Sequence, residues 1–368
     1  MTKKMLLMWL VSLTFSWVFL TPAALAQAGD KTLSHAPEGS FSIVVIPDTQ
    51  RYRERDTKIQ SDSTNRLANP VFDAHTRWIA NNLKSQRIVF VSHSGDIVDK
   101  NNTDQWQVAR QCMDRLHGRV PYGISVGNHD MTGKGNSALF QKYFSADRFK
   151  SFDWYGGTFP VDPERPNASG NNANSYQRFS GEGLNFVILH LECNAPDEVL
   201  RWADRIFEEY TDRWAIVTTH MDLGVLEHPT TARGYFDDPK GRMRWAKRHG
   251  SRGNSPQQMW DKCFRKPKNL LIIFSGDQSR VTAMYLKSTG DHGNTVHALM
   301  SDYTSSGPLR IYRFLPAKSE IQVITYDTTR DKLINETRTV PGRENHQFMI
   351  HQDLTLEAPA SSKRTQSP

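Results

Sequence analysis

The chain has 368 residues, of which 38% are hydrophobic and 23% charged, with a formal net charge of +7. That length and composition support one large folded domain or two small ones, with a sizeable core. The basic balance fits an anionic ligand, with a merely solvated basic surface as the alternative. No clear nucleic-acid motif occurs, because no basic run is interleaved with aromatic residues.

The first 26 residues have the pattern of a secretory signal. Lys3 and Lys4 precede an apolar run over residues 5–20, and Ala24-Leu25-Ala26 is an A-x-A cleavage site. A membrane anchor is the alternative, but a run of about sixteen residues is short for a span. The residue directly after the site is Gln27 and not a cysteine, which argues against a lipoprotein, and no other long apolar run exists. We therefore expect an exported protein, periplasmic or extracellular, with no membrane span after signal removal.

We expect residues 27–40 to form an extended leader, residues 41–340 one folded domain, and residues 341–368 a mobile tail without pattern. The three cysteines are an odd number for an exported chain. Buried free thiols are the favoured reading, because two of them fall on apolar faces of predicted helices. One disulfide plus one free thiol is the alternative. These cysteines are Cys112, Cys193 and Cys263.

The chain begins its folded part with an apolar run. Residues 41–46, FSIVVI, predict a core strand that Pro47 ends, and Asp48-Thr49-Gln50 then lies on a loop. Residues 51–69 are charged and lack periodicity, which predicts a loop beside that site. Residues 70–84 carry apolar side chains at helical spacing and predict a helix.

Residues 88–130 contain the most informative pattern. One apolar run ends in Gly95-Asp96, a second ends in Gly127-Asn128-His129-Asp130, and an amphipathic helix with Thr103 as its cap lies between them. Strand, helix and strand imply a right-handed crossover between parallel strands. Both polar clusters then lie at the strand ends where open α/β sheets bind ligands.

The residue types in these clusters are those of a metal site. Asp96 offers two hard oxygens, Asn128 a neutral oxygen and His129 an imidazole. Oxygen-rich sites with some imidazole suit divalent metals. Glycine before each cluster lets the backbone turn sharply and approach a ligand closely. His93, three residues before Asp96, is a weaker candidate for a supporting role.

The second half of the chain repeats this alternation. Core strands are predicted at residues 185–191, 214–219 and 270–274, with a helix over 196–210 and another starting at 255–256. His220 and Asp277 follow two of these strands. The long loop at 155–175 is either mobile or part of a substrate rim. The basic insertion at 224–256 is either a lid or phosphate-attracting surface, or a solvated basic face. Runs at 295–300, 309–314 and 320–326 resemble an antiparallel meander completing a second sheet.

Taken in order, these motifs resemble the calcineurin-like metallophosphoesterase family over roughly residues 41–326. The family's five motifs are DxH, GDxxD, GNHD or GNHE, a later strand-end His, and GHxH. Their counterparts here are Asp48-Thr49-Gln50, Gly95-Asp96 with Asp99, Gly127-Asn128-His129-Asp130, His220, and Gly276-Asp277-Gln278-Ser279. The middle three match fully. The first has Gln50 in place of a histidine, and the last has Asp277 and Ser279 in place of two.

The resemblance implies a four-layer α/β/β/α sandwich of two mixed sheets, with metals at the carboxyl edge of the strands. It implies that two divalent ions are held, with Asp96 between them, by Asp48, Gln50, Asp96, Asn128, His220 and Asp277. The altered residues shift this set towards oxygen, which favours Mn²⁺, Mg²⁺ or Ca²⁺ over Zn²⁺ or Fe. We expect one ion to bind well and the other weakly or only with substrate.

The resemblance further implies a metal-dependent hydrolase of phosphoesters that activates water for in-line attack. In this reading His129 lies above the metals as a non-ligand and stabilises charge or protonates the leaving group. Asp130 or Asp99 orients its neighbours. The alternative is a non-catalytic module of the same fold that binds an anionic ligand, which the altered motifs favour. The substrate is a phosphorylated small molecule or polymer; monoester versus diester and the oligomeric state are left open.

Overall fold

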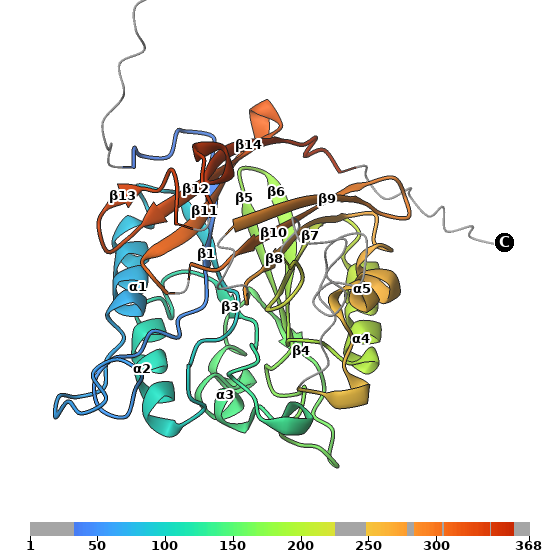
Figure 1. Ribbon diagram of the computed structural model, residues 1–368. Coiled ribbons are helices and arrows are strands. Elements are labelled where there is room, and N and C mark those ends of the chain that lie inside the picture. Colours follow the sequence, from blue (N-terminus) through green and yellow to red (C-terminus); the bar gives the residue numbers. More distant parts are fainter. Residues whose placement is uncertain (1–32, 225–247, 278–282, 304, 339, 357–368) are drawn as a thin grey trace, which may run out of the picture.

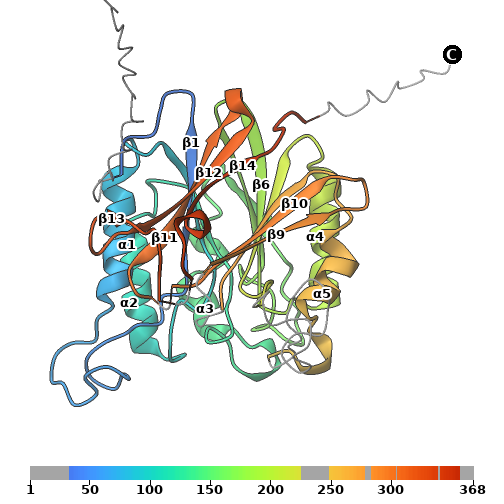
Figure 2. The same ribbon diagram turned by 45° about the horizontal axis from the view of Figure 1, so that its top comes forward.

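The computed structural model describes residues 33–224, 248–277, 283–303, 305–338 and 340–356 (Figure 1). The predicted signal, Ser279 and most of the 224–256 insertion lie outside these residues. Two mixed sheets lie face to face between outer helices, which confirms the predicted four-layer α/β/β/α sandwich (Figures 1 and 2). No helix in the described ranges is both long and apolar enough to cross a bilayer.

The first sheet has the strand order β13-β12-β11-β1-β2-β3, with β14 also paired to β12. Its first three strands along the chain are parallel, and the later ones add antiparallel. The strands are β1 (Phe41–Ile46), β2 (Ile88–His93), β3 (Tyr122–Ile124), β11 (Pro308–Leu315), β12 (Glu320–Asp327), β13 (Lys332–Leu333) and β14 (Gln347–His351).

The second sheet has the order β4-β5-β6-β7-β8-β10-β9. Its central strands β6, β7, β8 and β10 are parallel, and antiparallel strands close both sides. The strands are β4 (Tyr155–Thr158), β5 (Ser175–Gly181), β6 (Leu184–Leu191), β7 (Trp214–Thr219), β8 (Leu270–Ser275), β9 (Ala283–Thr289) and β10 (Thr295–Ser301).

Helices cover the outer face of each sheet. Figures 1 and 2 show α1 and α2 beside the first sheet and α4 and α5 beside the second. Asparagine caps start the first two: the Asn102 side chain accepts from the Gln105 amide, so Asn102 and not Thr103 is the cap of α2. The helices are α1 (Pro70–Asn82), α2 (Thr103–Asp114), α3 (Ala138–Tyr143), α4 (Asp197–Glu209) and α5 (Pro256–Met259).

Three hydrophobic clusters lie between the four layers. One contains Trp106 of α2 and packs under the first sheet, and one contains Phe207 of α4 and packs under the second. The third joins the two sheets, where the rings of Phe90 and Phe179 stack 4.7 Å apart. All three cysteines are free and buried, as favoured from the sequence. The sheets are therefore fixed against one another directly beneath their strand ends.

The predicted meander is confirmed only for its last two runs, which pair antiparallel as β11 and β12; the first run, β10, lies in the other sheet. β10 runs parallel to β8 in the second sheet, whereas β11 and β12 extend the first sheet from β1. The alternation of apolar residues identifies strands but does not choose their partners. The predicted loop at 155–175 likewise contains a strand, β4, whose consecutive glycines hide the apolar pattern.

The predicted mobile tail is also wrong for residues 341–356. β14 pairs antiparallel with β12, and Ile350 lies opposite Ile321 in the core between the sheets. The indole Nε1 of Trp214 donates to the Leu354 carbonyl at 3.0 Å. A short edge strand with one fully buried side chain gives little periodic signal.

Replacing Ile350 with alanine is expected to lower the free energy of unfolding by about 2–5 kcal/mol, because the side chain is only 2% exposed. Met349 on the opposite face of β14 is 39% exposed. Met349→Ala, its matched control, should change stability by about 0.5 kcal/mol or less. Urea unfolding of both variants measures the difference, and equal effects would contradict a folded β14.

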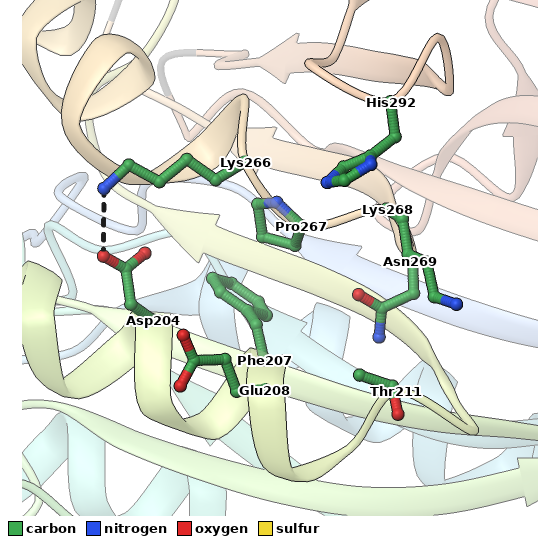
Figure 3. A pocket seen from close by; sticks show the side chains of 9 residues that line it. All are labelled: Asp204, Phe207, Glu208, Thr211, Lys266, Pro267, Lys268, Asn269 and His292. Carbon is green, nitrogen blue, oxygen red and sulfur yellow. Dashed lines mark hydrogen bonds and ion pairs between the residues drawn. The ribbon is translucent and has the colours of Figure 1, made fainter. Parts of the chain in front are cut away.

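The amino ends of the second sheet's parallel strands border a cavity of about 380 Å³ (Figure 3). Its walls come from the end of α4 and from the segment leading into β8, where Lys266 Nζ lies 3.2 Å from Asp204 Oδ2. The polar residues singled out in the sequence follow the carboxyl ends of the strands. This cavity is therefore at the opposite edge from them.

Candidate active site

Five of the predicted metal ligands meet at the carboxyl edge of the sandwich. Each lies just after a parallel strand: β1, β2 and β3 of the first sheet, and β7 and β8 of the second. Because both sheets present these ends at one edge, residues far apart in the chain converge. They are Asp48, Asp96, Asn128, His220 and Asp277.

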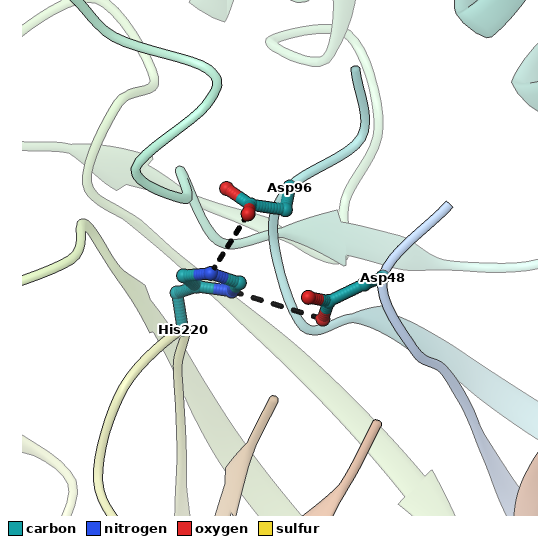
Figure 4. A group of neighbouring side chains, drawn as sticks. All are labelled: Asp48, Asp96 and His220. Carbon is teal, nitrogen blue, oxygen red and sulfur yellow. Dashed lines mark ion pairs between the residues drawn. The ribbon is translucent and has the colours of Figure 1, made fainter. Parts of the chain in front are cut away.

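His220 lies at the centre of this group. Its Nε2 is 3.3 Å from Asp96 Oδ2, 3.2 Å from Asn128 Oδ1 and 3.5 Å from Asp277 Oδ1. Figure 4 shows the imidazole between Asp96 and Asp48, whose Oδ1 is 3.9 Å from Nδ1. Nδ1–H donates to the carbonyl of Ser94 at 3.0 Å. In this tautomer the lone pair of Nε2 faces the other ligands.

Glycines let the loops approach the ligands. A Cβ at Gly127 would lie 2.2 Å from Asp96 Oδ1, and one at Gly276 would lie 2.4 Å from Asp48 Oδ1. Gly95 has φ 105°, and a Cβ there would lie 2.8 Å from His220 Nδ1. The glycines of the second, third and last motifs are thus required by close packing around the ligand atoms.

The charges of this group call for a cation. Asp48, Asp96 and His220 are buried, and one ligand atom of each lies within 4.8 Å of the others. Burial and the neighbouring carboxylates raise the pKa of Asp48 well above its usual value. Burial on its own would raise the pKa of Asp96, but the charge of His220 and its hydrogen bond outweigh burial and lower the pKa of that carboxyl. Carboxylates and an imidazole so closely packed fit a divalent metal.

Asp302 is a carboxylate near the site that the sequence reading missed. It follows β10, which pairs with β8 through Met300 and Ser275, and it is buried. After burial, Asp302 is the strongest influence raising the pKa of Asp48. Nearby, Ser305 Oγ donates to the Asp48 carbonyl at 2.7 Å. An acidic residue directly after a core strand was the available signal.

His93 holds the first two ligand loops together. Its Nδ1 accepts from the Gly95 amide at 3.1 Å, so its Nε2–H donates to Thr49 Oγ1 at 3.0 Å. Thr49 in turn donates its hydroxyl to the Ile97 carbonyl and its amide to the Asp96 carbonyl. The loops carrying Asp48 and Asp96 are therefore tied through one neutral imidazole, which agrees with the supporting role considered for His93.

A second buried network ties the two sheets. Ser92 Oγ of β2 lies 2.8 Å from Thr218 Oγ1 of β7 and 2.9 Å from Nε2 of His190 on β6. His190 Nδ1–H donates to Gln177 Oε1 at 2.7 Å. The strands joined in this way are those that end at Asp96 and His220. The network thus sets the separation of two ligands from different sheets.

His129 contacts Asp96 without being one of the converging ligands. Its backbone amide donates to Asp96 Oδ1 at 2.7 Å, and its Nδ1–H donates to the Asp99 carbonyl at 2.7 Å. The side chain is one-third exposed. The Asp99 carbonyl therefore fixes the ring and leaves Nε2 for a bound molecule.

The two predicted orienting acids act differently. The Asp99 carboxylate pairs with Lys58 Nζ at 2.6 Å and lies 3.9 Å from His129 Nδ1, so Asp99 orients the histidine through its carbonyl. Asp130 accepts from the amides of Gly127 and Val98 at 2.8 and 3.2 Å. Burial and Asp96 raise the pKa of Asp130 to about 7. Asp130 thus closes the loop that carries His129.

Gln50 presents its amide nitrogen to the site. Its Nε2 donates to Asp96 Oδ2 at 2.7 Å. The same oxygen faces His220, so Gln50 hydrogen-bonds to a ligand and does not point an oxygen at the centre in this arrangement. Ser279, the other altered position, lies outside the described residues.

A family model, calcineurin-like phosphoesterase, matches residues 41–253. The uncharacterized protein YvnB of Bacillus subtilis (strain 168) is 27% identical over 327 residues, covering 85% of this chain and 22% of that protein. Purple acid phosphatase PPD1 from yellow lupin (Lupinus luteus) seeds superposes with a TM-score of 0.50 at 15% identity, covering 86% of this chain and 55% of that one.

A 5'-nucleotidase precursor from Thermus thermophilus has a TM-score of 0.44 at 13% identity, covering 83% of this chain and 56% of that one. The chain thus spans about a fifth of YvnB and about half of each of these two enzymes. At such identities the lupin enzyme supports the fold. The family match covers more than half of the chain, and its motifs meet in space. The chain therefore belongs to the calcineurin-like phosphoesterase family, whose chemistry is the metal-dependent hydrolysis of phosphoesters.

Proposed function

We propose that this chain is an exported phosphoesterase with one strongly held divalent metal and a second that binds weakly or only with substrate. The observation that carries the proposal is the convergence of five predicted ligands around His220, with His129 beside them. Asp48, Asp96, Asn128, His220 and Asp277 would hold the metal. A divalent ion there supplies Lewis acidity that polarises a phosphoryl group and activates water.

The chain's own groups position the substrate and handle the proton. The His129 amide holds Asp96 Oδ1, and the Asp99 carbonyl holds the imidazole so that Nε2 faces outward. That nitrogen can donate a proton to the oxygen of the departing alcohol when the imidazole is charged. Burial of the ligands strengthens each electrostatic interaction with the phosphoryl charge.

The donor set supports Mn²⁺, Mg²⁺ or Ca²⁺ in preference to Zn²⁺ or Fe. Asp277 supplies a carboxylate in place of an imidazole, and the side-chain amide of Gln50 donates a hydrogen bond to Asp96. Only His220 among the six predicted ligands offers a nitrogen lone pair. Hard oxygen ligands suit these three cations. Equilibrium titration with each metal tests the preference; two tightly bound zinc ions per chain would exclude it.

Replacing His129 with alanine is expected to lower kcat by about 10²–10⁴, because a proton donor at the leaving group is lost. Hydrolysis of an aryl phosphomonoester and an aryl phosphodiester is measured with Mn²⁺, Mg²⁺, Ca²⁺ and Zn²⁺ separately. His351→Ala is the matched control, because that side chain is 78% exposed on β14. Full activity in His129→Ala would exclude the proposed role.

The same assay separates the second candidate, a non-catalytic module that binds an anionic ligand. The hydrogen bond from Gln50 to Asp96 favours it, because this bond engages an oxygen that a second metal would need. A silent native protein combined with an active Asp277→His variant would establish a disabled site. Activity in the native protein that is lost in His129→Ala would establish the phosphoesterase.

A further inference from the structure

A second cavity, of about 530 Å³, opens on the same edge as the metal ligands. Three segments line it: residues 133–136, 165–168 and 249–252. The first of these follows Asp130 directly in the chain. We call this cavity of about 530 Å³ the distal cavity. No residue of the family's five motifs lines it.

Backbone contacts fix the distal cavity to the active-site loops. The Gly135 amide donates to the Arg248 carbonyl at 3.0 Å, and the Ser137 amide donates to the Asn167 carbonyl at 2.9 Å. Beneath it, Glu192 follows β6, and the next residue, Cys193, donates its amide to Val126 two residues before Asn128. Backbone hydrogen bonds therefore join the walls of the distal cavity to the loops that carry the metal ligands.

The rim of the distal cavity is cationic. Lys134, Arg165 and Arg252 come from its three segments. Two acids offset part of this charge: Arg165 Nη2 lies 2.7 Å from Asp162 Oδ2, and Arg252 pairs with Glu198. Three basic and two acidic side chains leave one positive charge in excess on the rim itself, and the carboxylate of Glu192 lies beneath it, 3.7 Å from His249. Lys134, at φ 61°, and Arg165 are the exposed members of this rim, and Arg252 is half-buried.

Polar atoms without hydrogen-bond partners lie under this rim. Both ring nitrogens of His249 and Oε2 of Glu192 are buried and have no hydrogen-bond partner among the described residues; the contact between His249 Nε2 and that Oε2, at 3.7 Å, is too long for a hydrogen bond. Buried polar groups are usually paired, so unpaired ones next to a cavity indicate a ligand-binding surface. A Cβ at Gly135 would lie 2.4 Å from His249 Nδ1, so the ring directly supports the segment carrying Lys134.

We propose that the distal cavity binds an anionic group of the substrate separate from the phosphoryl group at the metal centre. This rests on the proposed function and specifies its substrate class: phosphoesters with a second anion, such as bisphosphates or phosphorylated acids. The cavity has the size of small-molecule sites. Lys134 and the two arginines contact the second anion, and His249 donates to it from beneath.

The test uses ligands that cannot be hydrolysed. Alkane bisphosphonates of increasing chain length are compared with alkyl monophosphonates of the same length, by calorimetry with the metal-loaded protein. At the length that spans the two sites, the bisphosphonate should bind about tenfold tighter, as expected for charge-assisted hydrogen bonds. Lys134→Ala should reduce this preference to about threefold, whereas Lys318→Ala, an exposed lysine on the turn before β12, should retain it.

His249→Phe distinguishes a binding role from a structural one. The ring shape over Gly135 is kept, but Glu192 Oε2 loses the nitrogen that lies 3.7 Å from it, so a moderate loss of stability is expected and urea unfolding of the ligand-free variant must show that the fold persists. The bisphosphonate preference should nevertheless fall. Equal affinity for bis- and monophosphonates at every length, or a preference retained in both Lys134→Ala and His249→Phe, would overturn the proposal.

Hydrolysis of the aryl phosphate by the same preparations keeps the two proposals apart. Hydrolysis without any bisphosphonate preference overturns only the distal cavity. A preference without hydrolysis overturns only the catalytic reading, and the cavity then serves the binding module.

Discussion

Asp96→Asn should abolish measurable phosphoester hydrolysis, lowering kcat/KM by about a thousandfold or more, which is about 4 kcal/mol of transition-state stabilisation. Asp96 accepts from the His129 amide and from Gln50 Nε2, and it lies 3.3 Å from His220. The substitution removes the charge that a metal needs. It also brings an amide NH₂ towards the Gln50 donor, because the side chain keeps its shape.

Metal content and activity are measured together in this variant, and both should fall. Asp104→Asn is the matched control, since Asp104 is an exposed acid in the first turn of α2. A native-like unfolding transition would show that the fold persists. Retention of a tenth of the native activity would contradict the placement of Asp96 at the centre.

Three histidines that are buried in neutral form should each make the protein less stable as the pH falls below about 6.5, and the raised pKa values of Asp48 and Asp130 should offset part of that loss. Burial lowers the pKa of His75 to about 4 and of His93 and His190 to about 3. The unfolded chain binds protons at these residues near pH 6.5, whereas the native state does so only near pH 3–4. Their contribution is thus complete above pH 6.5 and is lost as the pH falls, by of the order of 5 kcal/mol in total at pH 5.

Urea unfolding at pH 7.5 and pH 5, with chelator present at both, measures this loss without a contribution from metal release. His75→Phe should remove about 2 kcal/mol of it, since one protonation site is lost. This substitution should lower the free energy of unfolding at pH 7.5 only slightly, because His75 Nε2 has no hydrogen-bond partner and Thr328 also donates to the Gly307 carbonyl. His351→Phe, at an exposed position, should leave the acid sensitivity intact. If His75→Phe loses as much stability between pH 7.5 and pH 5 as the native protein does, His75 is not buried in neutral form.

The sequence predicted the convergence at Asp96, Asn128 and His220 because each follows an apolar run, and parallel strands end at one edge. The four layers were implied by the family resemblance, with which the alternation of strands and helices agrees. Asp302 was missed because its nearness to Asp48 depends on β10 pairing with β8, and such pairing is a property of the whole sheet.

Other features depend on the directions in which side chains point, which the spacing of residues in the sequence does not determine. The amide of Gln50 offers both an oxygen and a nitrogen, and only the surrounding carboxylate selects the nitrogen. The carbonyl of Asp99, not its carboxylate, holds His129. The strand at Gln347–His351 was missed because a single buried face of two or three residues resembles polar coil.

The ligands come from both halves of the sandwich: Asp48, Asp96 and Asn128 from the first sheet, His220 and Asp277 from the second. An ion held by ligands from both sheets is a cross-link between layers that also meet through apolar packing and through polar contacts such as that of Ser92 with Thr218. The free energy of ion binding then becomes free energy of folding. The working lifetime of the protein would thus follow the supply of its cation, and starvation for that ion would remove the protein as well as its activity.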